Sequence, residues 1–69
     1  MTANEALDQY MSSLDNKSRI AKSRDIRVLC RISASVLCFW RKGRTPIPWY
    51  MLDKITDAIG ENIFENIGK

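Results

Sequence analysis

The amino-acid sequence predicts an all-α fold, a compact bundle of about five short helices in one domain that spans residues 1–69. In several segments, apolar residues recur at the three- and four-residue spacing of a helix. Residues that favour helix starts and stops, among them Thr2, Ser33, Gly43 and Gly60, separate these segments. A length of 69 residues, 45% of them hydrophobic and 28% charged, is typical of a single small globular domain.

The first helix is predicted for residues 3–14. Thr2 is followed three residues later by Glu5, which is the spacing of a capping box. The apolar residues that follow lie at i, i+3, i+4 and i+7 and are Leu7, Tyr10, Met11 and Leu14. One face of this helix is therefore expected in the core.

The segment between residues 15 and 32 leaves two interpretations open. A polar break follows the first helix, and Asn16 or Ser18 could cap the next one. The apolar residues of this segment do not fall on a single stripe, so either one long helix or two short ones would explain them. We favour a break near Ser23, with Ser23 capping a short helix over residues 24–31.

The next helix is predicted for residues 34–42. Ser33 is a favourable N-cap residue, and Gly43 tolerates the left-handed conformation that ends many helices. The inward stripe of this helix is expected to consist of Val36, Leu37 and Trp40.

A connector and two further helices complete the predicted chain. Pro46 and Pro48 exclude helical structure from residues 45–48, which should be extended. A sustained helical period then continues to the stop signal at Gly60 through Met51, Leu52, Ile55, Ala58 and Ile59. Residues 61–69 are expected to form a short fifth helix, because they hold Ile63, Phe64 and Ile67 at helical spacing.

The charge is distributed very unevenly along the chain. The formal net charge is +3, but residues 1–16 carry −3, residues 17–44 carry +8 and residues 45–69 carry −2. Such a focused basic block is typical of proteins that bind a polyanion, either nucleic acid or an anionic membrane surface.

The composition argues against an enzyme, a metal protein or a membrane-spanning protein. The chain has no histidine, no glycine-rich phosphate loop and no nucleophile paired with a base, so we expect no catalytic residue, no cofactor, no metal and no small-molecule substrate. Cys30 and Cys38 are interpreted as small buried hydrophobic residues in a reducing cytoplasm. No stretch approaches the roughly 20 apolar residues of a membrane span, and no signal peptide is recognisable.

The middle of the chain resembles the helix-turn-helix of the phage Cro and repressor family. The resemblance is carried by a short helix, Ile32-Ser33, a second helix that ends in Trp40, and the basic turn Arg41-Lys42-Gly43-Arg44-Thr45-Pro46-Ile47-Pro48. It covers about a third of the chain by motif. The buried positions of the motif would be Ile26, Cys30, Ile32, Leu37 and Trp40, all of them apolar as required.

Two residues depart from the pattern of this family. Arg27 stands where a small residue usually permits a close helix crossing, so its side chain must escape to solvent. Arg31 stands where glycine usually opens the turn, at a cost of roughly 1 kcal/mol in the left-handed region. An alternative alignment places Ile20-Ala21 at the small-residue position and lengthens the first helix of the motif.

The resemblance implies a sequence-specific transcriptional regulator that binds double-stranded DNA. Its recognition helix, residues 34–42, would lie in the major groove and turn Ser33, Ala34, Ser35, Cys38 and Phe39 towards the bases. None of these side chains makes the strong bidentate pairs with guanine or adenine, so phosphate contacts should supply much of the affinity. The expected phosphate contacts are Lys22, Arg24, Arg31, Arg41, Lys42 and Arg44.

A regulator of this kind is expected to act as a homodimer on a two-fold symmetric operator, in the cytoplasm or nucleoid of a bacterial host. We place the dimer interface on Ile63, Phe64 and Ile67, with the alternative that Phe64 closes the core of its own chain. At least one of Trp49 and Tyr50 is expected to be partly buried.

Two other functions compete with this one. A protein-interaction module, such as an antirepressor or adaptor of the same fold, would use the surface of Ala34, Cys38 and Phe39. A peripheral membrane protein would combine the basic block with Trp49 and Tyr50. Binding to random duplex DNA that weakens steeply with salt would distinguish the regulator from the interaction module.

Overall fold

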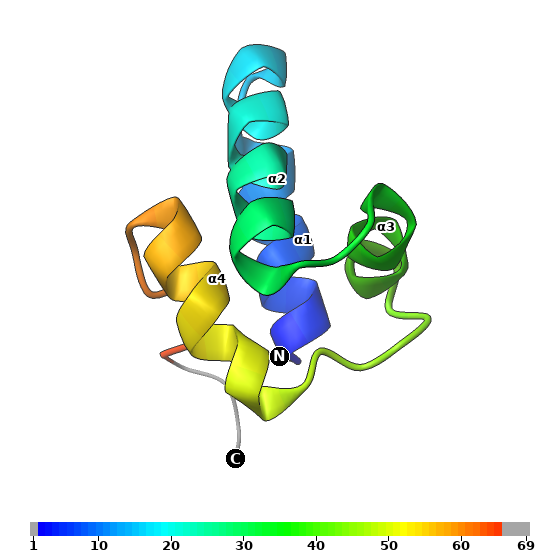
Figure 1. The fold of residues 1–69 in the computed structure, drawn as a ribbon. Coiled ribbons are helices and arrows are strands. Elements are labelled where there is room, and N and C mark those ends of the chain that lie inside the picture. Colours follow the sequence, from blue (N-terminus) through cyan, green and yellow to red (C-terminus); the bar gives the residue numbers. More distant parts are fainter. Residues whose placement is uncertain (1, 66–69) are drawn as a thin grey trace.

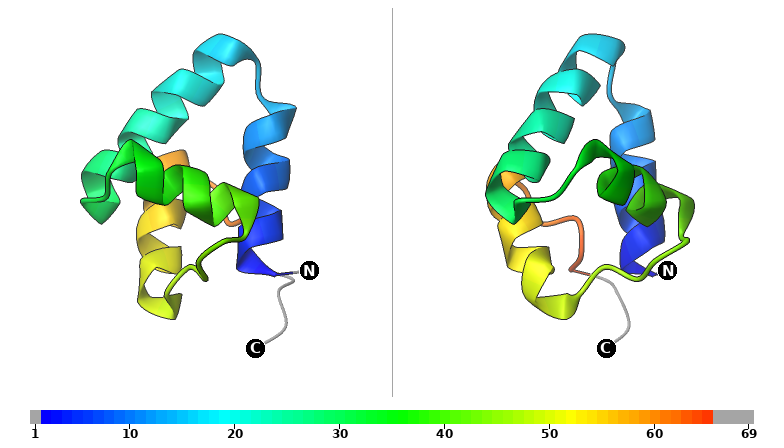
Figure 2. Two further views of the ribbon diagram at one scale, coloured as in Figure 1. Left: turned by 90° about the vertical axis from the view of Figure 1, so that its right-hand side faces the viewer. Right: turned by 45° about the vertical axis from the view of Figure 1, so that its right-hand side comes forward.

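The computed structural model describes residues 2–65, which form four α-helices and one short 3-10 helix and contain no strand. The α-helices are α1 (Ala3–Ser13), α2 (Asn16–Cys30), α3 (Ala34–Lys42) and α4 (Leu52–Ile59), and the 3-10 helix η1 (Trp49–Met51) leads into α4. Figure 1 shows α3 and α4 on opposite sides of α2, and Figure 2 shows α3 crossing beside α1. The predicted all-α fold is confirmed, with four α-helices in place of about five.

α1 begins at the predicted capping box. The Thr2 hydroxyl accepts a hydrogen bond from the Glu5 N–H at 3.1 Å, and the Glu5 carboxylate accepts one from the Thr2 N–H at 3.0 Å. The helix buries Ala6, Leu7 and Met11 against the rest of the chain. This short helix is therefore held at its start by its own side chains and along one face by packing.

α2 is one uninterrupted helix, so the predicted break near Ser23 is wrong. The N-cap is also different from the two residues proposed for it. Asp15 takes this position, and its carboxylate accepts a hydrogen bond from the Ser18 N–H at 3.2 Å. The first helix of the resembled motif is accordingly longer than the short helix expected for residues 24–31.

The apolar residues of α2 follow no single stripe because several of them are exposed. Ile26 and Cys30 lie in the core, whereas the side chains of Ile20, Val28 and Leu29 remain largely in solvent. The hypothesis of a break assumed that every apolar residue of the segment was buried. The helix is continuous because burial of one face suffices to hold it, whatever the other faces carry.

The turn between α2 and α3 uses Arg31 in the left-handed conformation, with φ 56° and ψ 47°. The Arg31 N–H donates to the Arg27 carbonyl and the Ile32 N–H donates to the same carbonyl at 3.1 Å. Ser33 then caps α3, its hydroxyl accepting a hydrogen bond from the Val36 N–H at 3.2 Å. The predicted start of α3 and the strained conformation at Arg31 are both confirmed.

The connector after α3 is extended as predicted and leads into α4. Gly43 ends α3 at φ 74°, and Gly60 ends α4 at φ 79°. Between them Ile47 is the buried residue of the connector, and Pro48 immediately precedes η1. The chain thus returns to the core at Ile47 before it enters the last helices.

The predicted fifth helix is absent from residues 61–65, and the remainder of the segment, with Ile67, lies outside the described residues. The left-handed turn at Gly60 sends the chain back across the molecule instead of prolonging the helix. Phe64 consequently packs in the core of its own chain, and its N–H donates to the Asn62 side-chain oxygen at 3.0 Å.

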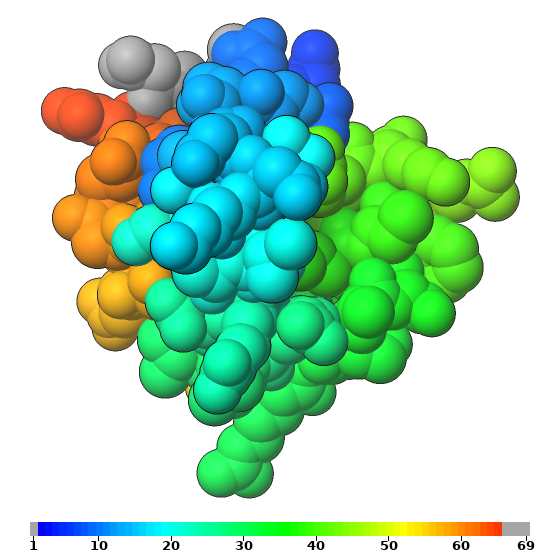
Figure 3. Space-filling view, turned by 90° about the horizontal axis from the view of Figure 1, so that it is seen from above, coloured from blue at the N-terminus to red at the C-terminus, as the bar shows by residue number. Residues whose placement is uncertain are grey.

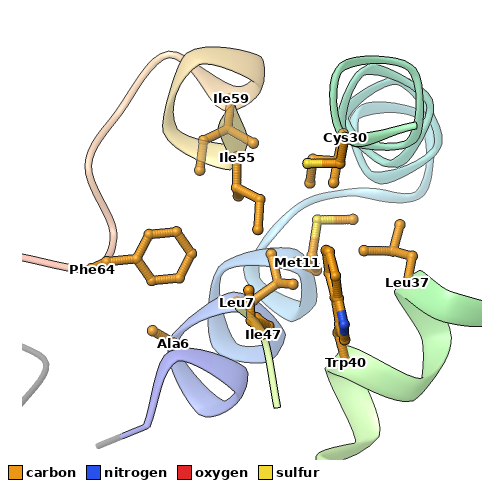
Figure 4. Packing of buried hydrophobic residues seen from close by; sticks show 11 residues of the cluster. Ala6, Leu7, Met11, Cys30, Leu37, Trp40, Ile47, Ile55, Ile59 and Phe64 are labelled. Atoms are coloured by element: carbon orange, nitrogen blue, oxygen red, sulfur yellow. The ribbon is translucent and has the colours of Figure 1, made fainter. Parts of the chain in front are cut away.

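One hydrophobic core joins all the elements. Figure 4 shows side chains from α1, α2, α3, the connector, α4 and the C-terminal segment converging on one another. The buried residues are Ala6, Leu7, Met11, Ile26, Cys30, Leu37, Trp40, Ile47, Ile55, Ile59 and Phe64. All buried positions predicted for the motif lie in this core except Ile32, which is partly buried against it.

Within residues 2–65 no helix combines the length and the apolar character needed to traverse a bilayer.

Candidate nucleic-acid interface

The residues predicted to face DNA bases lie together on the exposed side of α3. Leu37 and Trp40 on the opposite side are 4% exposed and fix the rotation of the helix. All five predicted base-facing residues are exposed, namely Ser33, Ala34, Ser35, Cys38 and Phe39. The α3 face, as we call this set together with Lys42 one turn beyond Cys38, consists of small side chains and the 42% exposed ring of Phe39, and it ends in a cation.

α3 is fixed to α1 at its C-terminal end by a contact that the sequence did not indicate. The side-chain amide of Asn4 donates to the carbonyl oxygens of Trp40 and Thr45, each at 2.8 Å. These bonds satisfy a carbonyl at the end of the helix and one in the connector beyond it. Because the partners are 36 and 41 residues from Asn4, no local pattern could have identified them.

Exposed cations flank the α3 face at both ends. Arg31 precedes the helix in the turn, Lys42 ends it, and Arg44 follows in the connector. Arg24 is also exposed, on α2. These four of the six predicted phosphate contacts are open to solvent, and none forms a salt bridge with another described residue.

The other two predicted phosphate contacts have structural roles inside the chain. Arg41 is half-buried, and its Nε lies 3.0 Å from an Oδ1 oxygen of Asp8 on α1. Lys22 lies on the side of α2 that faces α4, where its Nζ donates to the carbonyl of Ile59 at 3.3 Å. The Arg41 contact stabilises the packing of α3 on α1, and the Lys22 contact satisfies a carbonyl at the C-terminal end of α4.

The charges are segregated in space as well as along the chain. On one side of α2, α4 and the described part of the segment after it carry the exposed carboxylates Asp53, Asp57 and Glu61 against the single exposed cation Lys54. α3 lies on the other side of α2 and contains no acidic residue (Figure 1). The resulting field would turn the α3 side of the molecule towards a polyanion before contact is made.

An open groove of about 320 Å³ separates α2 from α3. Its apolar lining consists of Ile20, Ala34, Leu37 and Cys38, and its polar lining of Asn16, Arg19, Ser23 and Arg27. In Figure 3, α2 lies in the middle with the surface of α3 on one side and that of α4 on the other. Arg27, which stands where the resembled motif usually has a small residue, is half-buried and lines this groove, and its Nε donates to the Ser23 carbonyl of its own helix at 3.4 Å.

The alternative alignment, with Ile20-Ala21 at the close crossing, is supported in one respect and not in another. α2 is a single long helix that runs to its cap at Arg31, which agrees with the lengthened first helix that this alignment expects. Ala21 is exposed, however, and Ile20 lines the open groove with its side chain 61% exposed, so neither residue is buried at a close crossing.

The two cysteines differ, which corrects the expectation that both are buried. Cys30 is 3% exposed, and burial raises the pKa of its thiol above the ordinary value. Cys38 is exposed on the α3 face because it lies on the side of the helix opposite Leu37 and Trp40. Ala34, one turn before Cys38 on that face, is small, so a ligand could approach the thiol from that side.

Two further predictions for this part of the molecule are wrong. Trp49 is 81% exposed and Tyr50 is 55% exposed, and their rings pack edge to face with centroids 5.8 Å apart. η1 places both residues outside the core, which Ile47 and Met51 contact instead. Phe64 is 9% exposed and packs in the core of its own chain, as the alternative prediction held, and Ile63 is partly buried against the same core. The third residue predicted for the dimer interface, Ile67, lies outside the described residues.

The chemistry available on the α3 face is limited to small contacts and surrounding charge. A methyl group such as that of Ala34 can contact a thymine methyl, and the Ser35 hydroxyl can donate or accept a hydrogen bond. The bidentate pairs that distinguish guanine and adenine need longer polar side chains than the face provides in its first two turns.

Comparison of the chain with protein-family models, with curated proteins and with solved structures finds no match.

Proposed function

We propose that this protein is a small DNA-binding transcriptional regulator that inserts the α3 face into the major groove. The observation that carries the proposal is the combination found at α3. A helix that is fixed by the core along one side presents Ala34, Ser35 and Cys38 on the other, with Phe39 beside them and exposed cations at both ends. Small side chains permit a helix to enter the groove deeply, and the flanking cations meet the phosphates on either side.

In the proposed complex, affinity and sequence selection come from different residues. Arg31, Lys42 and Arg44 contact phosphates and hold α3 in register, with Arg24 as a further contact. Ala34, Ser35 and Cys38 contact base edges weakly, so selection depends on thymine methyl groups and on the shape of the DNA.

The regulator is proposed to bind a two-fold symmetric operator as a homodimer, inside a bacterial cell. Two recognition helices of a dimer must lie about 34 Å apart to reach successive major grooves. Since Phe64 belongs to the core, we now assign the interface to the exposed aromatic pair Trp49 and Tyr50. Aromatic residues of this kind are enriched in protein interfaces.

A charge introduced on the α3 face tests the proposal without disturbing the fold. Ser35 lies in the first turn of α3, where an aspartate is favourable to the helix dipole, so Ser35→Asp should leave the melting temperature unchanged or raise it. The same variant should bind duplex DNA at least about fivefold more weakly, because a like charge then faces the phosphates.

Gln9→Glu is the matched control, since Gln9 is exposed in the middle of α1, away from both helix ends, and the substitution makes the same change in net charge. Fluorescence anisotropy with a labelled random-sequence duplex at low salt measures both variants. Equal weakening by the two substitutions would show that only net charge matters and would refute the assignment of α3 as the DNA-contacting helix.

A further inference from the structure

The groove between α2 and α3 is unusual for a chain this small, because it combines cations with apolar side chains and has no carboxylate in its lining. Two of the lining side chains are arginines, Arg19 and Arg27, both on α2. The DNA-binding mode proposed above makes no use of Arg19 or Arg27. These features point to a second ligand.

Both arginines of the groove retain unused hydrogen-bond donors. A terminal nitrogen of Arg19 donates to the Leu14 carbonyl at 3.3 Å, while its Nε is buried and has no hydrogen-bond partner among the described residues. Arg27 Nε donates to the Ser23 carbonyl at 3.4 Å, a long bond within its own helix. A guanidinium has five N–H donors in a fork that matches a carboxylate, so each side chain can still bind one.

The apolar part of the surface extends beyond the groove along α2. Ile20 is 61% exposed and Val28 is 69% exposed, and these residues lie on one side of the helix at i and i+8 with Arg24 between them. An occupant of the groove could thus extend over an apolar and cationic strip of about two turns.

The shape and chemistry of the groove favour a protein segment as its occupant. An open groove encloses too little of a small metabolite to hold it alone, whereas a protein segment makes further contacts outside the groove. A phosphate would satisfy the arginines but would leave the exposed apolar side chains of Ile20 and Ala34 without an apolar partner. A segment that presents leucine-like side chains next to carboxylates complements both parts.

We propose that the groove between α2 and α3 is a docking site for an acidic amphipathic segment of a partner protein, and that this segment and DNA bind in alternation. The alternation follows from shared residues. Ala34 and Cys38 line the groove and also belong to the α3 face. A segment that covers them would prevent α3 from entering the major groove, so the partner would act as an inhibitor of the regulator. The alternation with DNA rests on the proposed function, whereas the docking of the segment in the groove does not.

The test uses a short synthetic helical peptide with leucine and glutamate at i, i+4 spacing, labelled with fluorescein. Anisotropy measures its binding to the full chain without DNA, and amide chemical shifts locate the contact. We expect shifts centred on Ser23, Arg27 and Ala34. A peptide with glutamine in place of glutamate, and one with alanine in place of leucine, should each bind at least about tenfold more weakly.

Substitutions in the protein separate the groove from the rest of α2. Arg27→Ala removes one guanidinium without touching the core and should weaken peptide binding at least about tenfold. Ile20→Ala should weaken it as well, while Leu29→Ala, an equal truncation of an exposed residue away from the groove lining, should not. Melting curves confirm that the variants remain folded.

A competition experiment with a labelled random-sequence duplex completes the test. Displacement of the duplex by the peptide is the expected result. Simultaneous binding of both would overturn the alternation, and failure of the peptide to bind while the duplex binds would overturn the docking site but not the DNA-binding function. Peptide binding without any duplex binding would support the docking site and refute the regulator.

Discussion

Replacement of the two tryptophans by alanine gives the sharpest test of how the core fixes α3. Trp40 is 4% exposed and Trp49 is 81% exposed, so the same substitution is made once inside the molecule and once outside it. Truncation of a buried tryptophan costs about 3–5 kcal/mol, from lost transfer energy and from the cavity that remains. A domain of 69 residues has a total unfolding free energy of about 3–10 kcal/mol.

Trp40→Ala should therefore remove a third or more of the stability. Trp49→Ala should change it by less than about 0.5 kcal/mol at a protein concentration low enough for the chain to be monomeric, since Trp49 is assigned to the dimer interface. Urea denaturation followed by circular dichroism measures both values, and each kcal/mol corresponds to roughly 4–8 °C in the melting temperature of so small a domain. Near-wild-type stability of Trp40→Ala would show that α3 is rotated away from the orientation described above. The α3 face would then no longer be the exposed side of the helix.

Three further predictions concern single residues. Arg31→Gly should raise the unfolding free energy by about 0.5–1 kcal/mol, measured by melting, because glycine adopts φ 56° without strain. The same substitution should weaken duplex binding, measured by anisotropy, because it removes a cation. A thiol reagent should modify Cys38 rapidly in the native protein and Cys30 only after unfolding, since Cys30 is buried and burial raises the pKa of its thiol; equal rates would contradict the difference in burial. Acid should destabilise the fold, because the hydrogen bonds from Thr2 lower the pKa of Glu5 and those from Ser18 lower the pKa of Asp15. Both caps are fully formed above the ordinary carboxyl pKa values of about 4 and are lost as the pH falls through the lowered values, so a melting temperature that stayed constant from pH 5 to about pH 2 would contradict the assignment.

The sequence predicts correctly those helices whose N-cap residue, apolar face and C-terminal glycine indicate the same boundaries. The Thr2 and Glu5 capping box, the Ser33 cap and the turns at Gly43 and Gly60 all lie where local patterns place them. These signals depend on residues three or four positions apart, which is the distance over which a helix determines its own ends.

The errors in α2 and in the C-terminal segment arise from burial, which no local pattern encodes. Ile20 and Val28 are apolar but exposed, so the stripe of α2 was obscured. Phe64 has helical spacing to its neighbours, yet the turn at Gly60 brings it across the core instead. In both segments tertiary packing overrode the periodicity.

In the candidate site, too, features that depend on neighbouring residues were predicted and contacts between distant residues were not. The rotation of α3, and with it the exposure of Ala34 and Ser35, followed from the spacing of Leu37 and Trp40. The same spacing placed Cys38 on the exposed face, although its residue type had suggested burial. The pairing of Arg41 with Asp8 joins residues 33 positions apart and could be found only in the folded chain.

The most direct test of DNA binding through α3 is the salt dependence of affinity for a random-sequence duplex. The four exposed cations Arg24, Arg31, Lys42 and Arg44 predict that the logarithm of the binding constant falls with log salt at a slope of about −3.6 per protomer, or about −7 for a dimer. Lys42→Ala should flatten this slope by about one per protomer, whereas Lys54→Ala, which removes an exposed cation from α4, should leave it unchanged. A slope near zero, or an equal effect of the two substitutions, would contradict the proposal that this protein binds DNA through α3.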